Sequence, residues 1–570
     1  MRLMISLLIS LLLLAPSAAW EIRGSIYPVE NGIVNWSSES FAGFDLYGLE
    51  SLSLNISDGQ IKADDASYQT SVQQQSLAHK QWGYYSALSF LGQEYFIGYP
   101  EGCPIGEPLS FLSFGSGSLG KILIDSDESY TIESDEPLPL SDGYSLKLSD
   151  EEDRVKVDLY KEGNLMDSQI LLPPCDFVFR ASIANETATC IAAGIKANVR
   201  LEPKSFYTIK GLFQLSEDTE PIELGKEFGE MQVRKISDSG IESSNQNDLS
   251  LSRGQDFEIM DGIRIKTSDL NAAFNQLYIY RNSTESDVLE VRGEIASESF
   301  TWTPQNFAGF QYDMNSDLGN EVISTILIEG NRLLEPDGVV YATAAQPKDF
   351  QFRDWGQYGI ISFLGERFFV GYMNNSPLFN GQESALLANE KLSRILIDSN
   401  KPISIEDGAN LKMEDGFEAR ISVDKSCNST LIELYKNGEL VDSDYFKIPD
   451  TYTYEKMLPG MGDDITLLAI HILEADCSKT GSSIVDGIFQ ISEEVLDVSE
   501  NTEYDKMTIQ IVTSDDIVMN NEDNDIILGK NSDIILAGDY RLRSIDGEAL
   551  RYCIYKPAIL GQLEPKIIAA

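Results

Sequence analysis

The side chains that most often carry catalysis are scarce in this sequence of 570 residues, which contains only two histidines, His79 and His471. A serine or cysteine hydrolase needs a histidine beside its nucleophile. The motifs HExxH, GxSxG and GxxxxGK[ST] are absent from the sequence, as is any cluster of cysteine and histidine with metal-site spacing. We therefore interpret both histidines as surface or partly buried imidazoles and predict that the chain is not an enzyme.

Carboxylates are abundant instead, and a secreted glycosidase would need two of them roughly 5 to 10 Å apart. No pair stands out among the 91 acidic residues. Asp125–Tyr130, with Glu136 at its twelfth position, has part of the pattern of a calcium loop, but Tyr130 replaces the glycine at position six. We expect a β-turn there, and a similar acidic loop at 520–525. Loosely bound Ca²⁺ or Mg²⁺ between acidic faces is expected rather than a defined metal or cofactor site.

The charge balance limits the partners that this chain can have. Lys and Arg number 43, and the net charge is −48. Nucleic-acid binding depends on neutralising phosphates with Lys and Arg, so it is excluded as a function, and anionic lipid heads would be repelled. A surface of this charge attracts cations.

The N-terminus indicates export. Residues 1–19 have the pattern of a secretory signal peptide, with Arg2, the apolar run Ile5–Ala15 and small residues before a cleavage site at Trp20. The alternative is an uncleaved N-terminal anchor. No later stretch resembles a transmembrane helix, and the tail at 558–570 is too short to be a membrane anchor.

In an exported protein, cysteines can form disulfides and the asparagines of sequons can carry glycans. Disulfides are allowed among the six cysteines, and the favoured pairs are Cys175 with Cys190 and Cys427 with Cys477, although sequence alone does not fix the connectivity. Candidate N-glycosylation sites are the asparagines of six sequons: Asn35, Asn55, Asn185, Asn282, Asn374 and Asn428. Asn374 is the weakest of them because Pro377 follows its Ser376.

Several blocks of sequence that should form the structural elements occur twice in the chain. WGYYSALSFLGQEYFIGY begins at Trp82 and WGQYGIISFLGERFFVGY at Trp355, with ten of eighteen positions identical. Other pairs of blocks keep the same order: EIRG from Glu21 and EVRG from Glu290, FAGF from Phe41 and Phe307, ILIDS from Ile122 and Ile395, LYKEGNLMDS from Leu159 and LYKNGELVDS from Leu434, and GLFQLSE from Gly211 and GIFQISE from Gly487. We predict a tandem duplication, with copies at 20–280 and 288–557 joined by a linker at 281–287.

Each copy has the patterns of an all-β fold. Asn437-Gly438 between two alternating runs predicts a type I′ hairpin, across which Lys436 and Glu439 could pair. SFLGERFFVGY predicts a second hairpin that turns near Gly365. Because about 260 residues is large for one sandwich, we expect two β-sandwich subdomains in each copy, the second of them around GLFQLSE or GIFQISE.

These blocks, twice over and in order, resemble the S-layer family duplication domain of the tandemly duplicated S-layer proteins of methanogenic archaea. The resemblance covers essentially the whole mature chain. It implies paired β-sandwich subdomains, glycosylation, and self-association or association with other S-layer subunits in a lattice with narrow, negatively charged pores. Typical lattice-forming members continue into a polar stalk and a C-terminal anchor. This sequence stops soon after its second copy. That departure from the family pattern implies a soluble paralogue, a minor lattice component or an incomplete product.

We therefore predict a secreted structural protein of the cell-surface S-layer. The alternative is a secreted, soluble β-sandwich adhesin or carbohydrate-binding protein that stacks sugars on Trp82 and Trp355. We expect those tryptophans to be buried instead, since large aromatic side chains provide much of a core. A secreted glycosidase or protease is the remaining rival, and it would need an essential carboxylate pair.

Overall fold

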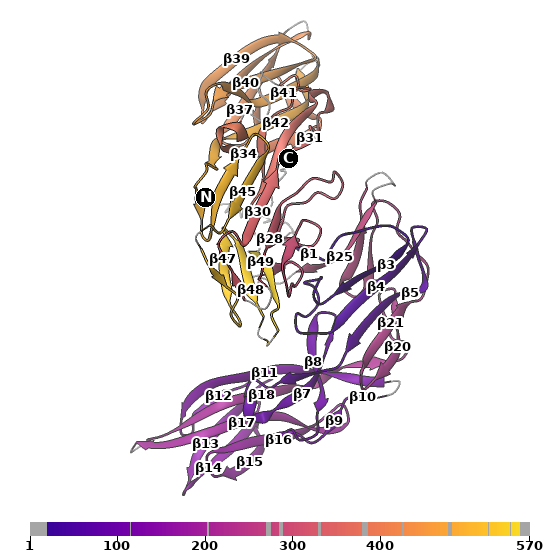
Figure 1. Cartoon of the computed structure of the whole chain (residues 1–570), viewed down its shortest axis with the longest axis vertical. Helices are drawn as coiled ribbons and strands as arrows, with labels where there is room; N and C mark the ends of the chain where they lie inside the picture. Colours follow the sequence, from indigo (N-terminus) through magenta and orange to yellow (C-terminus); the bar gives the residue numbers. More distant parts are fainter. Residues whose placement is uncertain are drawn as a thin grey trace, which may run out of the picture. The chain divides into compact units, whose positions relative to one another are not determined.

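The protein consists of two compact β units, Glu21–Asn282 and a unit that begins at Ser283 (Figure 1). The computed structural model describes residues 20–558 apart from 114–115, 202–203, 270–274, 284–288, 329–331, 379–385, 425–426, 477–480, 523, 546 and 548. In these residues the helical elements are the short 3-10 turns η1 (Lys80–Trp82), η3 (Arg353–Trp355) and η4 (Leu387–Asn389). No described helix is long and apolar enough to cross a membrane. The predicted all-β class is confirmed, whereas the predicted signal peptide and most of the tail lie outside the described residues.

The two ends of the first copy together build one β-sandwich, which we call its end subdomain. One sheet contains β1 (Trp20–Arg23), β2 (Tyr27–Pro28), β23 (Asp256–Met260), β24 (Ile263–Thr267) and β25 (Gln276–Ser283). The facing sheet contains β3 (Gly32–Ser37), β4 (Glu50–Ser57), β5 (Gln60–Ser71), β19 (Glu227–Phe228), β20 (Met231–Ser237), β21 (Gly240–Asn245) and β22 (Leu249–Ser250). Alternate residues of both sheets, such as Leu52 and Ile265, are buried between them.

The middle of the first copy forms a second sandwich, the inserted subdomain. Its large sheet contains β6 (Gln73–Ser76), β7 (Tyr84–Phe90), β8 (Gln93–Tyr99), β9 (Leu109–Ser110), β10 (Leu112–Ser113), β11 (Ser116–Glu133), β16 (Cys175–Ile183), β17 (Glu186–Leu201) and β18 (Lys204–Glu223). Its small sheet contains β12 (Pro137–Pro139), β13 (Tyr144–Glu151), β14 (Arg154–Lys161) and β15 (Asn164–Leu171). Phe96 and Phe213 of the large sheet share one core with Leu146 and Val157 of the small sheet. GLFQLSE lies in β18, so the second subdomain is where the sequence predicted it.

The second copy repeats this plan. Its end subdomain has one sheet with β26 (Leu289–Arg292), β47 (Asp533–Ala537), β48 (Tyr540–Ser544) and β49 (Tyr552–Ala558). The facing sheet has β27 (Phe300–Trp302), β28 (Val322–Thr325), β30 (Val339–Ala344), β43 (Glu503–Tyr504), β44 (Met507–Val512) and β45 (Asp516–Asn520), and β29 (Leu333–Leu334) pairs with β46 (Ile526–Ile527) beside them. One hydrophobic core joins these sheets.

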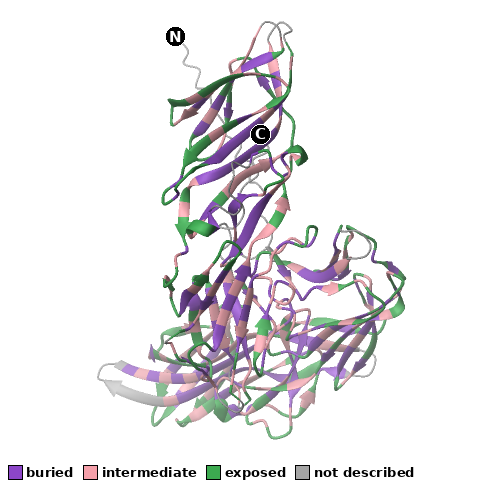
Figure 2. Ribbon diagram, turned by 45° about the horizontal axis from the view of Figure 1, so that its top comes forward, coloured by how far each residue is buried: buried purple, intermediate pink, exposed green. Residues whose placement is uncertain are grey.

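The inserted subdomain of the second copy is again a large sheet on a small one. The large sheet has β31 (Gln346–Asp349), β32 (Gln357–Phe363), β33 (Glu366–Tyr372), β34 (Lys391–Ser399), β35 (Ile403–Glu406), β40 (Asp450–Met457), β41 (Asp464–Asp476) and β42 (Ser482–Asp497). The small sheet has β36 (Asn410–Lys412), β37 (Phe417–Val423), β38 (Ser429–Lys436) and β39 (Glu439–Lys447). Figure 2 shows buried and exposed residues alternating along many strands, as expected where one face of a sheet covers a core.

Both hairpins predicted from the sequence are present. Asn437 and Gly438 join β38 to β39 with φ of 50° and 86°, as a type I′ turn requires. Lys436 and Glu439 lie opposite each other, but the predicted ion pair between them is wrong. The Lys436 ammonium instead pairs with Glu493 on the neighbouring large sheet. The second hairpin joins β32 to β33 through Leu364 and Gly365.

The turn of that second hairpin also connects the two subdomains of its copy. In the first copy, the equivalent turn at Leu91-Gly92 reaches the end subdomain and meets the buried carboxylate of Glu50 on β4. The Gly92 amide donates to Glu50 Oε1 at 2.9 Å, and the Tyr68 hydroxyl donates to the same oxygen at 2.7 Å. The Leu91 amide donates to the Tyr68 hydroxyl at 3.0 Å. Glu50 is only 2% exposed.

The second copy has the same junction around Glu321, which is fully buried. The Gly365 amide and the Tyr341 hydroxyl both donate to Glu321 Oε1 at 2.9 Å. Gly365 has a φ of +79°, and a Cβ there would lie 3.0 Å from the backbone oxygen of Gly309, so the turn strongly favours glycine. The turn is therefore shaped to bring a backbone donor onto a buried carboxylate.

We expect Glu321→Leu to lower the free energy of unfolding of the second unit by about 3 kcal/mol, because it leaves buried amide and hydroxyl donors without an acceptor. Denaturant unfolding followed by far-UV circular dichroism measures this loss. The matched control is Glu503→Leu, at an exposed glutamate of the same subdomain, which should change stability little. Equal effects of the two substitutions would contradict the role of Glu321.

The junction also predicts a pH dependence. Burial raises the pKa of the Glu50 and Glu321 carboxyls above the usual value of about 4.3. The stability linked to their protonated form is fully present below that value and is lost as pH rises through the folded-state pKa. The double variant Glu50→Gln with Glu321→Gln cannot lose this stability, because glutamine does not titrate. Its unfolding midpoint should therefore rise relative to that of the wild type as pH increases from 5 to 8. A difference that stays constant with pH would show that these pKa values are not raised.

Candidate functional site

The repeated tryptophans do not form an exposed binding platform. Trp82 is 1% and Trp355 2% exposed, which confirms the predicted burial and removes the observation on which a sugar-stacking site would rest. The Trp355 indole donates to Thr451 Oγ1 at 3.0 Å and packs edge-on against Phe350. These tryptophans therefore stabilise the inserted subdomains rather than bind a ligand.

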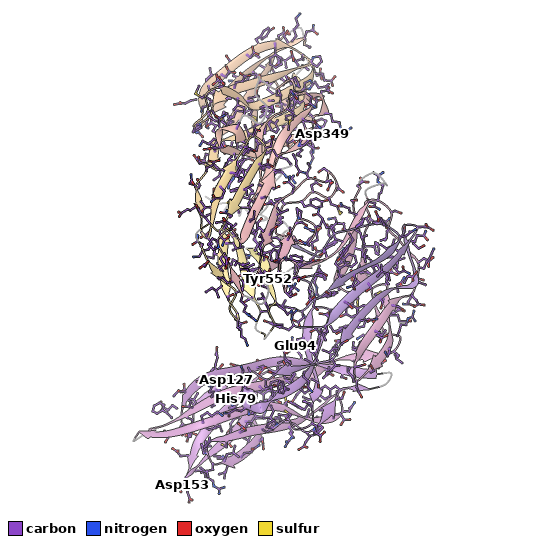
Figure 3. All side chains as sticks on the ribbon, viewed as in Figure 1. His79, Glu94, Asp127, Asp153, Asp349 and Tyr552 are labelled. Atoms are coloured by element: carbon purple, nitrogen blue, oxygen red, sulfur yellow. The ribbon has the colours of Figure 1, made fainter. Side chains whose placement is uncertain are left out.

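The two histidines occupy related places in the two copies, although their sequence positions differ. His79 is 4% exposed and contacts Asp127, Lys196 Nζ at 3.1 Å and the Trp82 ring. Figure 3 labels His79 and Asp127. The interaction with His79 is the main cause that lowers the pKa of Asp127.

In the second copy, Phe352 takes the place of His79, and His471 stacks on it at 4.4 Å between ring centroids. His471 Nδ1 lies 2.5 Å from Asp486 Oδ1. Among the described residues, neither histidine has a serine, threonine or cysteine side chain as a hydrogen-bond partner. The contacts of both rings are those of packing and hydrogen bonding.

The acidic segment that was predicted as a β-turn has a different structure. Asp125–Tyr130 does not form a β-turn, because it lies inside the long strand β11, whose pairing with β18 is irregular between Ser126 and Ser129. The Asp125 carboxylate accepts from the Ala78 amide at 2.9 Å, and burial raises its pKa. No group of three or more His, Cys, Asp or Glu arranged to hold a metal ion occurs in the described part of the chain.

The cysteines require a correction. Cys175 and Cys190 are both free, so the disulfide predicted between them is wrong. Cys175 lies opposite Ile195 in the β16–β17 ladder. Cys190 is five residues from Ile195, roughly 16 Å along the strand, which is too far for the Cα separation of under about 7 Å that a disulfide needs.

Only one cysteine of the other predicted disulfide lies in the described part of the chain. Cys427 is disulfide-bonded. Its predicted partner, Cys477, lies outside the described residues, so the pairing stays a prediction. Cys103 and Cys553 are free.

All six sequon asparagines have exposed side chains: Asn35, Asn55, Asn185, Asn282, Asn374 and Asn428. Asn35 and Asn55 lie on adjacent strands and on one face, because Asn35 pairs with Ser53 and Asn55 with Ile33 across the β3–β4 ladder. The hydroxyl residues of two other sequons, Ser376 and Thr430, are buried in the folded protein.

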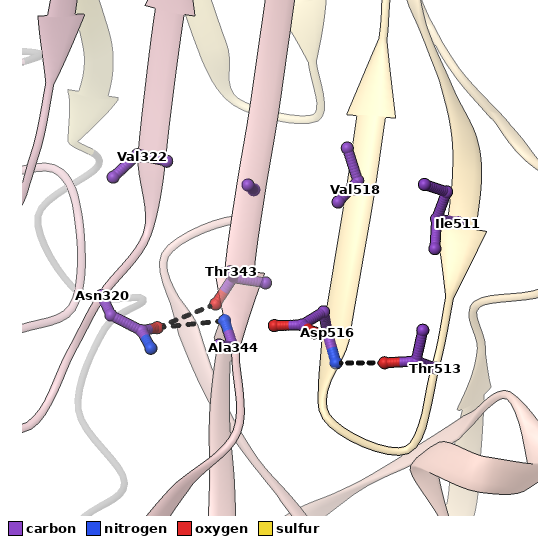
Figure 4. A pocket seen from close by; sticks show the side chains of 9 residues that line it. Asn320, Val322, Thr343, Ala344, Ile511, Thr513, Asp516 and Val518 are labelled. Carbon is purple, nitrogen blue, oxygen red and sulfur yellow. Dashed lines mark hydrogen bonds between the residues drawn. The ribbon is translucent and has the colours of Figure 1, made fainter.

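The second copy has a shallow hollow on the outer face of the sheet that contains β28, β30, β45 and β44 (Figure 4). Its volume is about 280 Å³, and its lining residues are Asn320, Val322, Ala342, Thr343, Ala344, Ile511, Thr513, Asp516 and Val518. Asn320 Oδ1 accepts from the Thr343 hydroxyl and the Ala344 amide, each at 3.2 Å, and Thr513 Oγ1 accepts from the Asp516 amide at 2.9 Å. The rim is thus fixed by hydrogen bonds, and the floor is aliphatic.

Two features escaped the reasoning from sequence. Glu50 and Glu321 were counted with the surface acids, although Glu50 begins the alternating strand β4 and Glu321 directly precedes the equivalent strand β28. The hollow also has a signal in the sequence, because VVYATA at Val339 places small or apolar residues on both faces of its strand, whereas ASYQTS at Ala66 alternates.

Comparison with known proteins agrees with this architecture. The family model described as S-layer protein matches residues 28–269 and 292–546, one region in each copy. A solved structure of transferrin-binding protein B from Haemophilus parasuis, 9% identical over 74% of this chain and 86% of that one, aligns with a TM-score of 0.09 and supports no conclusion.

Three curated relatives are each called Major S-layer protein. The Methanosarcina mazei protein is 25% identical, and the match covers 83% of this chain and 72% of the relative. The Methanosarcina barkeri protein is 24% identical with coverage of 83% and 70%, and the Methanosarcina acetivorans protein is 23% identical with 84% and 72%. The chain therefore belongs to the S-layer protein family, and it is a structural protein of the cell surface.

Proposed function

We propose that this protein is a subunit of an S-layer lattice whose acidic gaps admit cations and repel anions. The observation that supports this most is the match of the S-layer family to both copies of the duplicated β unit. Each copy presents extended sheet faces, which suit side-by-side contacts between subunits in a layer.

The barrier property follows from charge. A net charge of −48 on each chain gives any gap between neighbouring chains a negative potential. That potential extends about 8 to 10 Å from each wall at physiological ionic strength, so narrow gaps are filled by it. Small anions would be excluded from such gaps and cations concentrated in them.

The same charge opposes assembly unless it is neutralised. Loosely bound Ca²⁺ or Mg²⁺ between acidic faces would reduce the repulsion and bridge carboxylates of neighbouring chains. This form of binding needs no defined site with several ligands, and it is reversible on removal of the cation.

We expect the purified protein to form ordered two-dimensional arrays in millimolar Ca²⁺ or Mg²⁺, visible by negative-stain electron microscopy. NaCl at matched ionic strength is the control, because it screens charge without bridging carboxylates. Arrays should be fewer in NaCl, and a chelator should disperse the arrays formed with divalent ions. A protein that stays monomeric under every one of these conditions would overturn the lattice role.

The sequons make a separate prediction, to be measured by glycopeptide mass spectrometry of protein from native envelopes. If glycan transfer follows folding, Asn35, Asn55 and Asn185 should be modified, because each side chain is exposed. Asn374 and Asn428 should stay largely unmodified, because the folded protein buries their hydroxyl residues. Full occupancy of these two sites would show that transfer precedes folding, and absence of glycan at all sites would refute glycosylation.

A further inference from the structure

The outer faces of two equivalent sheets have diverged between the copies. In the second copy, one residue from each of β28, β30, β45 and β44 forms a continuous cross-strand row, which we call the apolar row: Val322, Ala342, Val518 and Ile511. In the first copy, strands β4, β5, β21 and β20 form the corresponding polar row: Ser51, Gln69, Glu242 and Lys235.

The correspondence of the two rows rests on register. Ser51 follows the buried Glu50, and Val322 follows the buried Glu321. At the other end, β20 has an irregularity between Val233 and Lys235, and β44 has one between Ile509 and Ile511. The two sheets are thus paired in the same way, and the four residues of each row occupy matching positions.

A sheet with this register does not require an apolar row. The first copy builds the same sheet with a polar row, in which Lys235 and Glu242 form an ion pair. The second copy instead leaves Ile511 47% exposed beside three half-buried aliphatic residues. Single exposed apolar residues are ordinary, whereas apolar residues that are contiguous across several strands are typical of interaction surfaces when the patch is large enough.

We infer that the apolar row is a contact surface for a second copy of this chain, with the same row of the partner packed against it across a two-fold axis. The inference rests on the proposed lattice function and names the face that one of its contacts uses. Two sheet faces can pack about 10 Å apart, as they do inside a sandwich, and one patch serves both partners in such a contact.

If copies of this chain contact one another, as the proposed function requires, charge favours a contact through the apolar row. Two chains that each carry a net charge of −48 repel one another over most of their surfaces. The apolar row has no charged side chain, and Asp516 is the one charged residue among those that line the hollow. This face therefore lets two acidic chains approach at a lower electrostatic cost than an acidic face would.

The two copies also divide the glycan sites. Asn35 and Asn55 project from the outer face that carries the polar row, and the strands of the apolar row contain no sequon. Attached sugars would cover the polar face and leave the apolar face free. The glycans and the proposed contact between chains would therefore lie on different faces.

The size of the face sets the strength of the contact. Strands are about 4.8 Å apart, so a row across four of them is roughly 14 Å wide. Such a patch supplies much less than the ~800 Å² per partner that a stable dimer buries. Association through it should depend on concentration, and it should strengthen where many chains are held in one layer.

The test exchanges the apolar row for the residues of the polar row in the full chain: Val322→Ser, Ala342→Gln, Val518→Glu and Ile511→Lys. The new Glu and Lys cancel, so the net charge is unchanged, and the first copy already folds with these residues at these registers. Sedimentation velocity over a concentration series in Ca²⁺ should show a loss of at least about tenfold in the association constant of the variant. Circular dichroism should show that it remains folded.

The reverse exchange in the first copy is the matched control: Ser51→Val, Gln69→Ala, Glu242→Val and Lys235→Ile. It should create a second apolar face and strengthen association. Should the first variant fail to fold, Val518→Cys gives an independent measurement, because a two-fold contact places this position near its counterpart and should yield a cross-linked dimer. Gln69→Cys, on the polar row, should cross-link much less.

The outcomes separate this inference from the proposed function. If wild type and the apolar-row variant form arrays equally well, the contact lies elsewhere and the inference fails, while the lattice role stands. If wild type never associates, both fail. If the cysteine of Val518→Cys is protected from labelling to the same extent at every protein concentration, another part of the same chain covers this face. Protection seen only in whole envelopes would place a different protein there, and either result overturns the second copy as occupant.

Discussion

Each copy of this protein depends on a buried carboxylate that accepts hydrogen bonds from the turn of a hairpin in the neighbouring subdomain. Glu50 and Glu321 lie in the end subdomains, while Gly92 and Gly365 belong to hairpins of the inserted subdomains. A carboxylate without partners would be costly at such depth, so the turn and the carboxylate require each other. The arrangement fixes how one sandwich meets the other within a copy, and it explains why the turn sequence LG is unchanged between the copies.

The duplication keeps this internal framework and varies the surface. The registers of the outer sheets, their irregular positions and the tyrosines that bond the buried carboxylates recur in both copies. The side chains that face outward do not, and the apolar row beside the polar row is the clearest case. A scaffold that is already stable can change its outer face without loss of fold, so two copies give one chain two different surfaces.

The sequence was sufficient for the fold class and the duplication because both depend on patterns that repeat in order. The hairpins at Asn437-Gly438 and Gly365 could also be predicted, since their turns require residues that tolerate positive φ. Pairings that depend on register could not. Cys175 and Cys190 are close in sequence but far apart along antiparallel strands, and Lys436 finds Glu493 on another sheet instead of the Glu439 opposite it. The candidate surface was missed because it appears only when four strands distant in sequence are placed side by side.

The order of strands has a mechanical consequence. In the second copy, Leu289 at the start of β26 lies opposite Ala558 at the end of β49, so the chain arrives and departs at the same end of one antiparallel pair. Tension along the polypeptide would open that pair one hydrogen bond after another, which is the weakest direction in which to load a β-ladder. The inserted subdomain, joined to the rest in the middle of the copy, carries none of that load. In a layer built from such chains, tensile strength would come from contacts between neighbouring chains rather than from the polypeptide that links the two copies.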